Sequence, residues 1–226
     1  MDKNERFYKF YHYANKLNYM IWLLEANLIF LGTNLPFVLV LILVPITLGN
    51  IPFYVLSSIT VIPSLYCLTK TLVQLRSGQE NVVRNYLNHF KSGFLPLLKK
   101  SLPFFLLIWL ILSNLVIINN VMKNQFLYWT NFILLYIVCT FLLNHIIVEA
   151  TWDQPFMDAV RLTAKLGIVR SLRTQLGAMI AVGSFFLFKY VPVYLVLYGI
   201  STTIFLCLLN FQPVVEFVES REENQL

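Results

Sequence analysis

The chain has 226 residues, of which 58% are hydrophobic and only 12% are charged, and its mean hydropathy is +0.69. A soluble domain averages about 45–50% apolar and about 25% charged residues, so this composition excludes a soluble globular protein. The net charge of +6 does not indicate a nucleic-acid partner, because the basic residues flank long hydrophobic segments. We expect a single integral membrane domain over residues 1–226, all-α in fold, with the lipid bilayer as its solvent.

The first segment combines aromatic and charged residues at helical spacing. Phe7 and Phe10 fall on one helical face, whereas Lys9 and Lys16 fall on the other. This pattern predicts an amphipathic helix over residues 1–21, which lies either in the membrane interface or against the protein's own loops. No short apolar run here leads to a small-residue cleavage site, so we expect the first span to remain as an uncleaved anchor.

Two predicted spans follow, near residues 22–44 and 53–72. The first span contains Pro36, which lacks a backbone donor and should kink the helix. Asn34 stands just before this proline. An uncharged turn over residues 45–52 connects the two spans, as expected of a hairpin on the outer side of the membrane.

Residues 70–101 form the most polar part of the chain and carry six basic residues. Tyr86, Phe90 and Phe94 belong to an apolar stripe at helical spacing, which predicts a second amphipathic helix over residues 79–92 on the cytoplasmic face. We consider these three aromatic side chains a candidate surface for a cytoplasmic partner, bound by helix-in-groove contact. The alternative is a lipid-facing collar without a partner.

The second half of the chain has four more predicted spans and another long polar connection. This connection, residues 149–176, carries four basic residues and a further amphipathic helix near residues 155–173. Beyond the last span we expect a polar, acidic and frayed tail. The four spans and the tail cover, in order, residues 102–121, 128–148, 175–188, 192–211 and 212–226.

The distribution of Lys and Arg orients these spans. The N-terminal segment, the two long connections and the tail hold 4, 6, 4 and 1 basic residues, which together are 15 of the 17. Only Lys123 and Lys189 lie in the other set of turns. Because positive charge is retained on the cytoplasmic side, we expect both termini in the cytoplasm. The predicted fold is a polytopic helical bundle of six transmembrane helices in three hairpins, with amphipathic cytoplasmic helices.

Polar side chains within apolar spans are candidates for function, because burying them in lipid costs free energy. The candidates are Asn34, Asn114, His145 and Glu149. Asparagines at such positions commonly hydrogen-bond neighbouring helices. His145 and Glu149 are four residues apart and share one helical face. We expect this pair to anchor the helix at the hydrated cytoplasmic boundary, and a proton relay is the alternative.

Motifs for catalysis or cofactor binding are missing from the sequence. It has no Walker-type phosphate loop, no HExxH zinc motif and no GxSxG nucleophile elbow. Cys67, Cys139 and Cys207 lie in separate apolar segments, so their spacing signals neither a disulfide framework nor a zinc site. We therefore expect a protein that is not an enzyme and that binds no metal or other cofactor.

Two stretches carry a family resemblance: IPSLYCLTKTLVQLRSGQENVVRNYLNHFKSGF at residues 62–94 and EATWDQPFMDAVRLTAKLG at residues 149–167. Together with an Asn–Leu pair in the first span, at Asn27 or Asn34, they resemble the YesL family of multipass membrane proteins from Gram-positive bacteria. The resemblance implies six helices in the bacterial cell membrane and no established catalytic residues. It also implies a role beside carbohydrate uptake, because genes for such proteins commonly accompany ABC-type sugar importers.

These observations favour a non-enzymatic accessory protein of carbohydrate uptake, which binds the permease or ATPase subunits of an ABC importer. The alternative is a small-solute transporter or channel subunit, for which a homo-oligomer is an option. A polar tunnel lined by Asn34, Asn114 and Trp109 would favour transport. A filled bundle with an exposed apolar cytosolic patch would favour the partner role.

Overall fold

The structure is a computed structural model that describes the backbone of residues 3–223 and the side chains of residues 17–187, 190–218 and 220. This part of the chain is helical and contains no strand. A 3-10 turn covers Leu48–Asn50, and π-helical segments cover Ile118–Met122 and Leu195–Gly199. The α-helices are α1 (Lys3–Thr33), α2 (Leu35–Leu43), α3 (Ile51–Ser57), α4 (Val61–Arg76), α5 (Val82–Ile117), α6 (Gln125–Trp152), α7 (Phe156–Val169), α8 (Ser171–Tyr190), α9 (Pro192–Tyr194) and α10 (Ile200–Glu223).

Four helical segments of the described chain are long and apolar enough to cross a membrane: Leu48–Arg76, Val82–Met122, Gln125–Trp152 and Pro192–Val218. Leu17–Thr33 and Leu35–Leu43 pass the same test as a pair bent by 72°, which adds a fifth segment if they form one broken span. The expectation of an all-α chain with several helices able to span a membrane is therefore confirmed. Six spans in three hairpins stay a prediction, and the fifth predicted span lies in α8, outside these segments.

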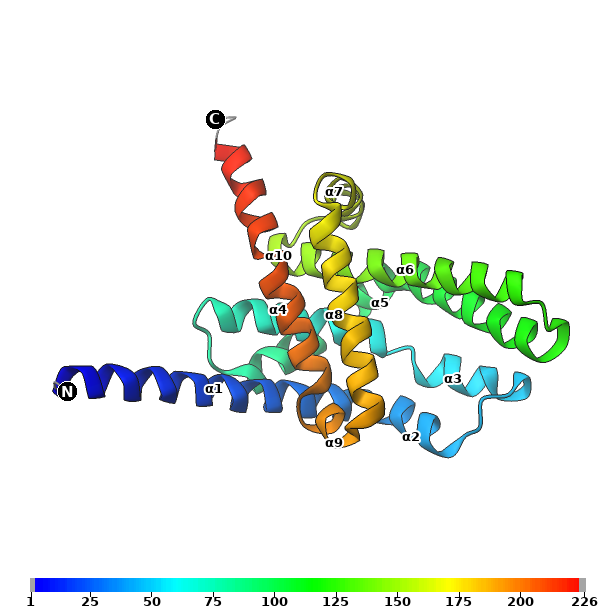
Figure 1. Ribbon diagram of the computed structural model, residues 1–226, viewed down its shortest axis with the longest axis horizontal. Coiled ribbons are helices and arrows are strands. Elements are labelled where there is room, and N and C mark those ends of the chain that lie inside the picture. The colour runs from blue at the N-terminus through cyan, green and yellow to red at the C-terminus, as the bar shows by residue number, and fades with distance from the viewer. Residues whose placement is uncertain (1–2, 224–226) are drawn as a thin grey trace.

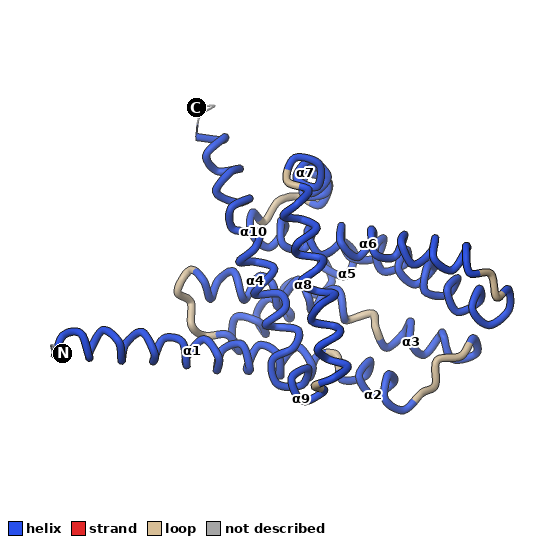
Figure 2. Tube along the Cα trace, in the orientation of Figure 1, coloured by secondary structure: helices blue, strands red, loops and turns tan. Residues whose placement is uncertain are grey.

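The helices form two groups that cross at a steep angle (Figure 1). α1, α4 and the α5–α6 pair run across the view, whereas α8 and α10 run side by side from top to bottom. The turns at residues 44–50 and 123–124 lie at the right, and the α8–α9 connection lies at the bottom. The start of α1 and the 77–81 loop lie at the left, whereas α7 lies at the top, as Figure 2 also shows. We call these left and top parts together the basic side.

The predicted amphipathic helix over residues 79–92 is not a separate element. It begins at Val82 and continues through the third predicted span as the 36-residue helix α5. Pro96 and Pro103 lie within α5 without ending it. An interior proline removes one backbone hydrogen bond and disfavours a straight helix, and α5 nevertheless continues past both residues.

The polar tail is also ordered. α10 continues through Pro213 to Glu223, so the expectation of a frayed tail is wrong for residues 212–223. The Arg76 guanidinium of α4 donates to the Gln212 side chain at 2.8 Å, and Val214 is fully buried. These contacts with α4 explain the helix, because tertiary packing stabilises segments that local propensity leaves marginal.

The core lies where α1, α4, α5, α6 and α10 meet. α4 is the most enclosed of these helices, with ten of its sixteen residues buried. Leu72 of α4, Tyr86 of α5, Ile147 of α6 and Phe211 of α10 belong to one buried cluster. By contrast, α2 buries none of its residues, so the α2–α3 hairpin extends away from this core.

Asn27 of α1 bridges a break in the last apolar segment. The π-helix between α9 and α10 leaves backbone groups without their α-helical partners. The Asn27 amide donates to the carbonyls of Leu195 and Val196 at 2.9 and 2.8 Å. Its oxygen accepts from the backbone amides of Ile200 and Ser201 at 2.9 and 3.2 Å. Lipid offers no hydrogen bonds, so the buried Asn27 side chain supplies the hydrogen-bond partners that these backbone groups would otherwise lack.

A second hydrogen-bond network connects the places where the first two predicted spans are interrupted, between α1 and α2 and between α3 and α4. α1 ends at Thr33, and the chain bends by 72° before α2, as the proline-containing sequence predicted. The Asn34 amide donates to the Phe30 carbonyl at 2.8 Å, and its oxygen accepts from the Thr60 hydroxyl between α3 and α4 at 2.9 Å. Thr33 also hydrogen-bonds Tyr86 of α5 at 2.8 Å. The expected hydrogen bond from Asn34 to a neighbouring segment is therefore present.

Replacing Asn27 by Ala should destabilise the protein more than replacing an asparagine that bonds only its own helix. Asn27→Ala leaves buried backbone groups without partners, which should cost at least about 2 kcal/mol. Asn131→Ala is the matched control, because half-buried Asn131 donates only to Leu127, one turn earlier in α6. Thermal unfolding of the detergent-purified variants measures the difference, and equal melting temperatures would contradict the role given to Asn27.

Candidate functional site

His145 and Glu149 of α6 lie together, as their spacing predicted. Nε2 of His145 is 3.7 Å from Oε2 of Glu149, which is longer than a hydrogen bond. Both side chains are buried, at 0% and 5% exposure. The expectation of anchoring at a hydrated boundary is therefore wrong for His145, because side chains of α4, α5 and α7 enclose its ring.

Four aromatic rings surround His145. The ring centroids of Tyr66, Phe104, Phe141 and Phe156 lie 5.2–6.4 Å from the imidazole centroid. Neither imidazole nitrogen has a hydrogen-bond partner in the described part of the chain. A proton relay through His145 and Glu149 stays a prediction.

Two lysines pair with carboxylates near the end of α6. Lys100 of α5 donates to Oε1 of Glu149. Lys70 of α4 donates to Oδ1 of Asp153 at 2.8 Å, and this ammonium holds the pKa of the Asp153 carboxyl below its usual range. Asp153 directly follows α6 with a φ of 48°, in the left-handed region that Asp tolerates better than most residues. Glu149 is almost fully buried, whereas the Asp153 side chain is 78% exposed.

These side chains line a cavity of about 200 Å³ between α4, α5 and α6, which we call the polar pocket. The Tyr66 hydroxyl and Oε2 of Glu149 are both buried, and the Tyr66 side chain interacts with Glu149. The two lysine–carboxylate pairs around this cavity make it a candidate functional site, because charged side chains within a membrane protein are commonly functional. The polar lining residues are Tyr66, Lys70, His89, Ser92, Lys100, Glu149 and Asp153.

Of these residues, only Glu149 was singled out from the sequence. A signal for Asp153 existed, because His145, Glu149 and Asp153 are spaced by four residues, the spacing of one helical face, although α6 ends one residue before Asp153. In the sequence, Lys70 and Lys100 contributed only to the count of basic residues that predicts the orientation of the chain in the membrane. Their pairing depends on the packing of α4 and α5 against α6, which no local pattern specifies.

Three larger cavities lie elsewhere in the described chain: one of about 280 Å³ beside Arg76 and Gln212, and two of about 380 and 430 Å³ in the bundle. Phe37, Trp109 and Leu112 line both cavities, and most of the other lining residues are apolar. Neither Asn34 nor Asn114 lines them, and Asn114 is exposed on α5. These residues therefore do not form the polar tunnel that would favour transport.

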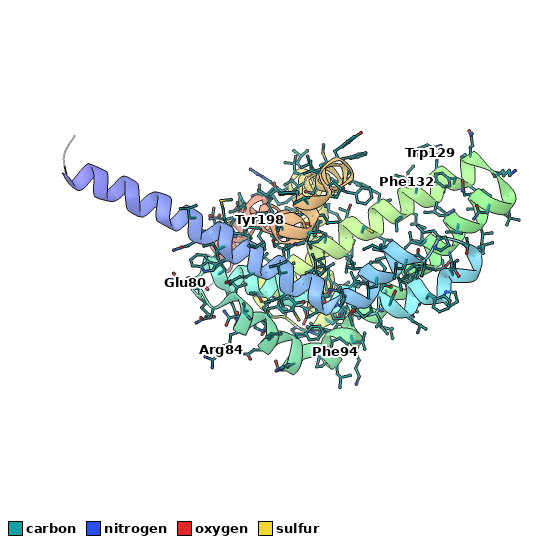
Figure 3. The ribbon with its side chains drawn as sticks, turned by 90° about the horizontal axis from the view of Figure 1, so that it is seen from below. Glu80, Arg84, Phe94, Trp129, Phe132 and Tyr198 are labelled. Carbon is teal, nitrogen blue, oxygen red and sulfur yellow. The ribbon has the colours of Figure 1, made fainter. Side chains whose placement is uncertain are left out.

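Most of the predicted partner surface is buried rather than exposed. Tyr86 is fully buried and hydrogen-bonded to Thr33, so its assignment to a partner surface is wrong. Phe90 stacks on Tyr86 with ring centroids 6.2 Å apart and packs against the main apolar cluster. Phe94 is half-buried and lies at the edge of the molecule in Figure 3. The stripe seen in the sequence therefore covers mainly the protein's own core.

A different stripe of α5 faces outward. Val83, Leu87 and Leu95 are 43%, 37% and 67% exposed. Arg84 and Lys91 are also exposed and lie between them in the sequence. Residues four apart fall on the same face of a helix, and Figure 3 shows Arg84 at the edge of the molecule. We call these five residues the α5 outer face.

A second exposed apolar group lies where α7 meets α8. Ile168, Val169 and Leu172 are 82%, 59% and 81% exposed. Arg170, between them, is held over the ring of Phe217 in α10 at 4.0 Å from the ring centroid, a cation–π contact. The basic side of the molecule thus presents aliphatic side chains that its own core does not cover.

Comparisons with protein-family models, with curated proteins and with solved structures returned no match for this chain. The resemblance to the YesL family and the association with carbohydrate uptake therefore stay predictions. Among the residues that the structure describes, no three His, Cys, Asp or Glu side chains gather in a way that could hold a metal ion. The function proposed below rests on surface, charge and burial.

Removing the Lys100 ammonium should destabilise the protein more than removing the Lys70 ammonium. Lys100→Met leaves the buried Glu149 carboxylate without its cation, which should cost about 2–4 kcal/mol. Lys70→Met leaves the largely exposed Asp153 alone, which should cost less than about 1 kcal/mol. Thermal or denaturant unfolding in detergent measures both variants. The double variant Lys100→Met, Glu149→Met should recover much of the loss, and equal effects of the two lysine variants would argue against a buried pair.

Proposed function

We propose that this chain is a non-enzymatic accessory protein of the bacterial cell membrane that binds a partner through the α5 outer face. In this proposal the chain has six spans in three hairpins and both termini in the cytoplasm. The partner is the permease or ATPase subunit of an ABC-type carbohydrate importer, as the resemblance to the YesL family implies. The observation that carries the proposal is the exposed apolar and basic stripe at the start of α5.

The length of α5 supports placing this stripe outside the lipid. A helix of 36 residues extends roughly 54 Å at 1.5 Å per residue, whereas the hydrocarbon core of a membrane is about 30 Å thick. The first half of α5 therefore projects beyond the hydrocarbon when the second half spans it. Arg84 and Lys91 belong to the projecting half, so Val83 and Leu87 lie beside charged groups rather than among lipid tails.

Charge adds to this argument. Basic residues gather on the connections of the basic side, and positive charge is retained in the cytoplasm. An exposed patch that mixes aliphatic and basic side chains is suited to a protein partner, because burial of the aliphatic carbons supplies affinity and the charges orient the encounter. The α7–α8 corner, with Ile168 and Leu172, extends the apolar surface available on this side.

A small-solute transporter or channel subunit, including a homo-oligomeric one, is the second candidate. The helix breaks at Asn34 and at Leu195–Gly199 favour it, because discontinuous helices form substrate sites in many transporters. The apolar lining of the two large cavities favours the accessory role instead.

Charges placed on the α5 outer face should abolish partner recovery. The test variant is Val83→Asp with Leu87→Asp, and the matched control is Asn81→Asp with Asn88→Asp, which adds the same charge at exposed positions on the same turns. Affinity purification in mild detergent with mass spectrometry should recover ABC permease or ATPase subunits with the parent chain and the control, and at least tenfold less with the test variant.

Equal recovery of ABC subunits with the test variant and with the control would contradict binding of the partner through the α5 outer face. Recovery of a clean homo-oligomer, together with solute flux in liposomes, would replace the accessory role with transport.

Cysteine labelling tests the proposed orientation. In a chain without its native cysteines, Lys91→Cys should react with an impermeant maleimide only after cells are opened, because it follows the 77–81 loop on the basic side. Asn120→Cys, in the π-helical segment that follows α5, should react in intact cells. The reverse pattern would contradict the proposed orientation.

A further inference from the structure

We propose that the two cavities that share Phe37, Trp109 and Leu112 form one groove, which holds an acyl chain of a membrane glycerolipid. We call it the acyl groove. Its outer part lies between the α2–α3 and α5–α6 hairpins, which extend to the right in Figure 1, and its inner part reaches α8 and α10. This inference is independent of the partner role, because the acyl groove shares no residue with the α5 outer face.

The inner part, of about 380 Å³, offers a ligand almost no hydrogen-bonding group. Its few polar side chains are already occupied or covered. The Ser58 hydroxyl accepts from the indole N–H of Trp109 at 2.9 Å, and the Tyr136 hydroxyl donates to Gln175 at 2.8 Å. The Thr140 hydroxyl is itself fully buried, so it lies beneath the wall of the cavity. Apolar cavities stay dry and bind apolar molecules, so the inner part selects a hydrocarbon.

Polar groups that a ligand can reach gather at the outer end of the groove. Asn119 and Asn120 are exposed, Tyr128 is half-buried, and all three line the outer part beside the turn at residues 123–124. Within the described chain, no Asp, Glu, Lys or Arg side chain lines either part of the groove. Amide and phenol groups donate hydrogen bonds without charge. They therefore suit the uncharged ester carbonyls from which the acyl chains of a glycerolipid extend.

The length of the groove matches one leaflet of a membrane. The α5 residues that line it extend from Phe105 to Val116, which is roughly 16 Å at 1.5 Å per residue. Half of a hydrocarbon core about 30 Å thick has nearly the same depth. An acyl chain with its ester at Asn119 and Asn120 would thus end in the inner part, near the middle of the bilayer.

The groove is open to the surrounding lipid. Leu41 and Ile46 at its outer part are 50% and 68% exposed, and Val182 at its inner part is 44% exposed. Acyl chains are the solvent on these surfaces, so mass action favours them over scarcer apolar molecules such as isoprenoids. An unfilled apolar space forfeits the dispersion contacts of its lining, and a bound chain restores them.

The first test leaves the sequence unchanged. The full-length chain is reconstituted with phosphatidylglycerol that carries a diazirine near the end of one acyl chain. It is then extracted into detergent and washed, so that lipid on the outer surface is lost before illumination. Peptide mass spectrometry should find adducts on the inner groove, at Ile108 and Leu112, at least tenfold more often than at Leu110, which is 60% exposed and lines neither cavity.

The second test blocks the groove with a bulky side chain. Leu112→Trp fills the junction of the two parts, and Leu110→Trp is the matched control on the outer surface of the same helix. Native mass spectrometry after washing should show one retained lipid with the parent chain and the control, and at least tenfold less with Leu112→Trp. Melting temperatures report whether each variant folds, and adduct mapping on the parent chain decides the question if Leu112→Trp does not.

A second pair of variants approaches the groove from α8. Ala181→Phe enters the inner part, whereas Gly183→Phe adds the same ring where a new Cβ meets nothing within 4 Å. Only Ala181→Phe should reduce lipid retention. A competition arm adds dioleoylglycerol or an isoprenoid alcohol to the crosslinking lipid, and dioleoylglycerol should displace the adduct at a concentration at least tenfold lower.

The assignment would be overturned by a parent chain that retains no lipid, by adducts as frequent at Leu110 as at Leu112, or by equal retention in folded Leu112→Trp and Leu110→Trp. Displacement by the isoprenoid alcohol at the lower concentration would also overturn it, in favour of an isoprenoid chain. Each of these results leaves the partner role standing, because the variants do not touch the α5 outer face.

Discussion

Hydrogen bonding of buried backbone groups is the constraint on which this structure depends. A membrane-spanning chain meets no water in the hydrocarbon, so every interruption of a helix must be satisfied by another part of the protein. Asn27 meets this requirement at the π-helix before α10, with bonds to Leu195 and Val196 on one side and to Ile200 and Ser201 on the other. These contacts tie the first and last apolar segments together across about the whole length of the chain.

Two polar networks meet this constraint between helices that are distant in sequence. Around Asn34 the polar groups of three segments satisfy one another, through bonds to Phe30 and Thr60 and from Thr33 to Tyr86. Around Glu149, the buried carboxylate accepts from Lys100 of α5 and interacts with Tyr66 of α4. Both networks join neighbouring helices through side chains that are buried or partly buried in the bundle.

Amphipathic patterns identify a helix more readily than they identify what covers it. The stripe containing Tyr86 and Phe90 was predicted as a surface for a partner, and it instead packs on the core and on Thr33. Either arrangement needs the same periodic apolar residues, so periodicity alone could not distinguish them. What distinguishes them is the tertiary contact with α1 and α4, which leaves Val83, Leu87 and Leu95 as the outward-facing apolar residues of α5.

Composition and hydropathy are sums over local residues, so they were enough to predict an all-helical chain with several apolar segments long enough to cross a membrane. The bend near Pro36 and the shared face of His145 and Glu149 were also predictable, since both follow from backbone chemistry and helical spacing. The aromatic rings around His145 and the contact of Lys100 with Glu149 became visible only in the folded chain. Those contacts join helices distant in sequence, and their geometry depends on how whole helices pack, which no local pattern encodes.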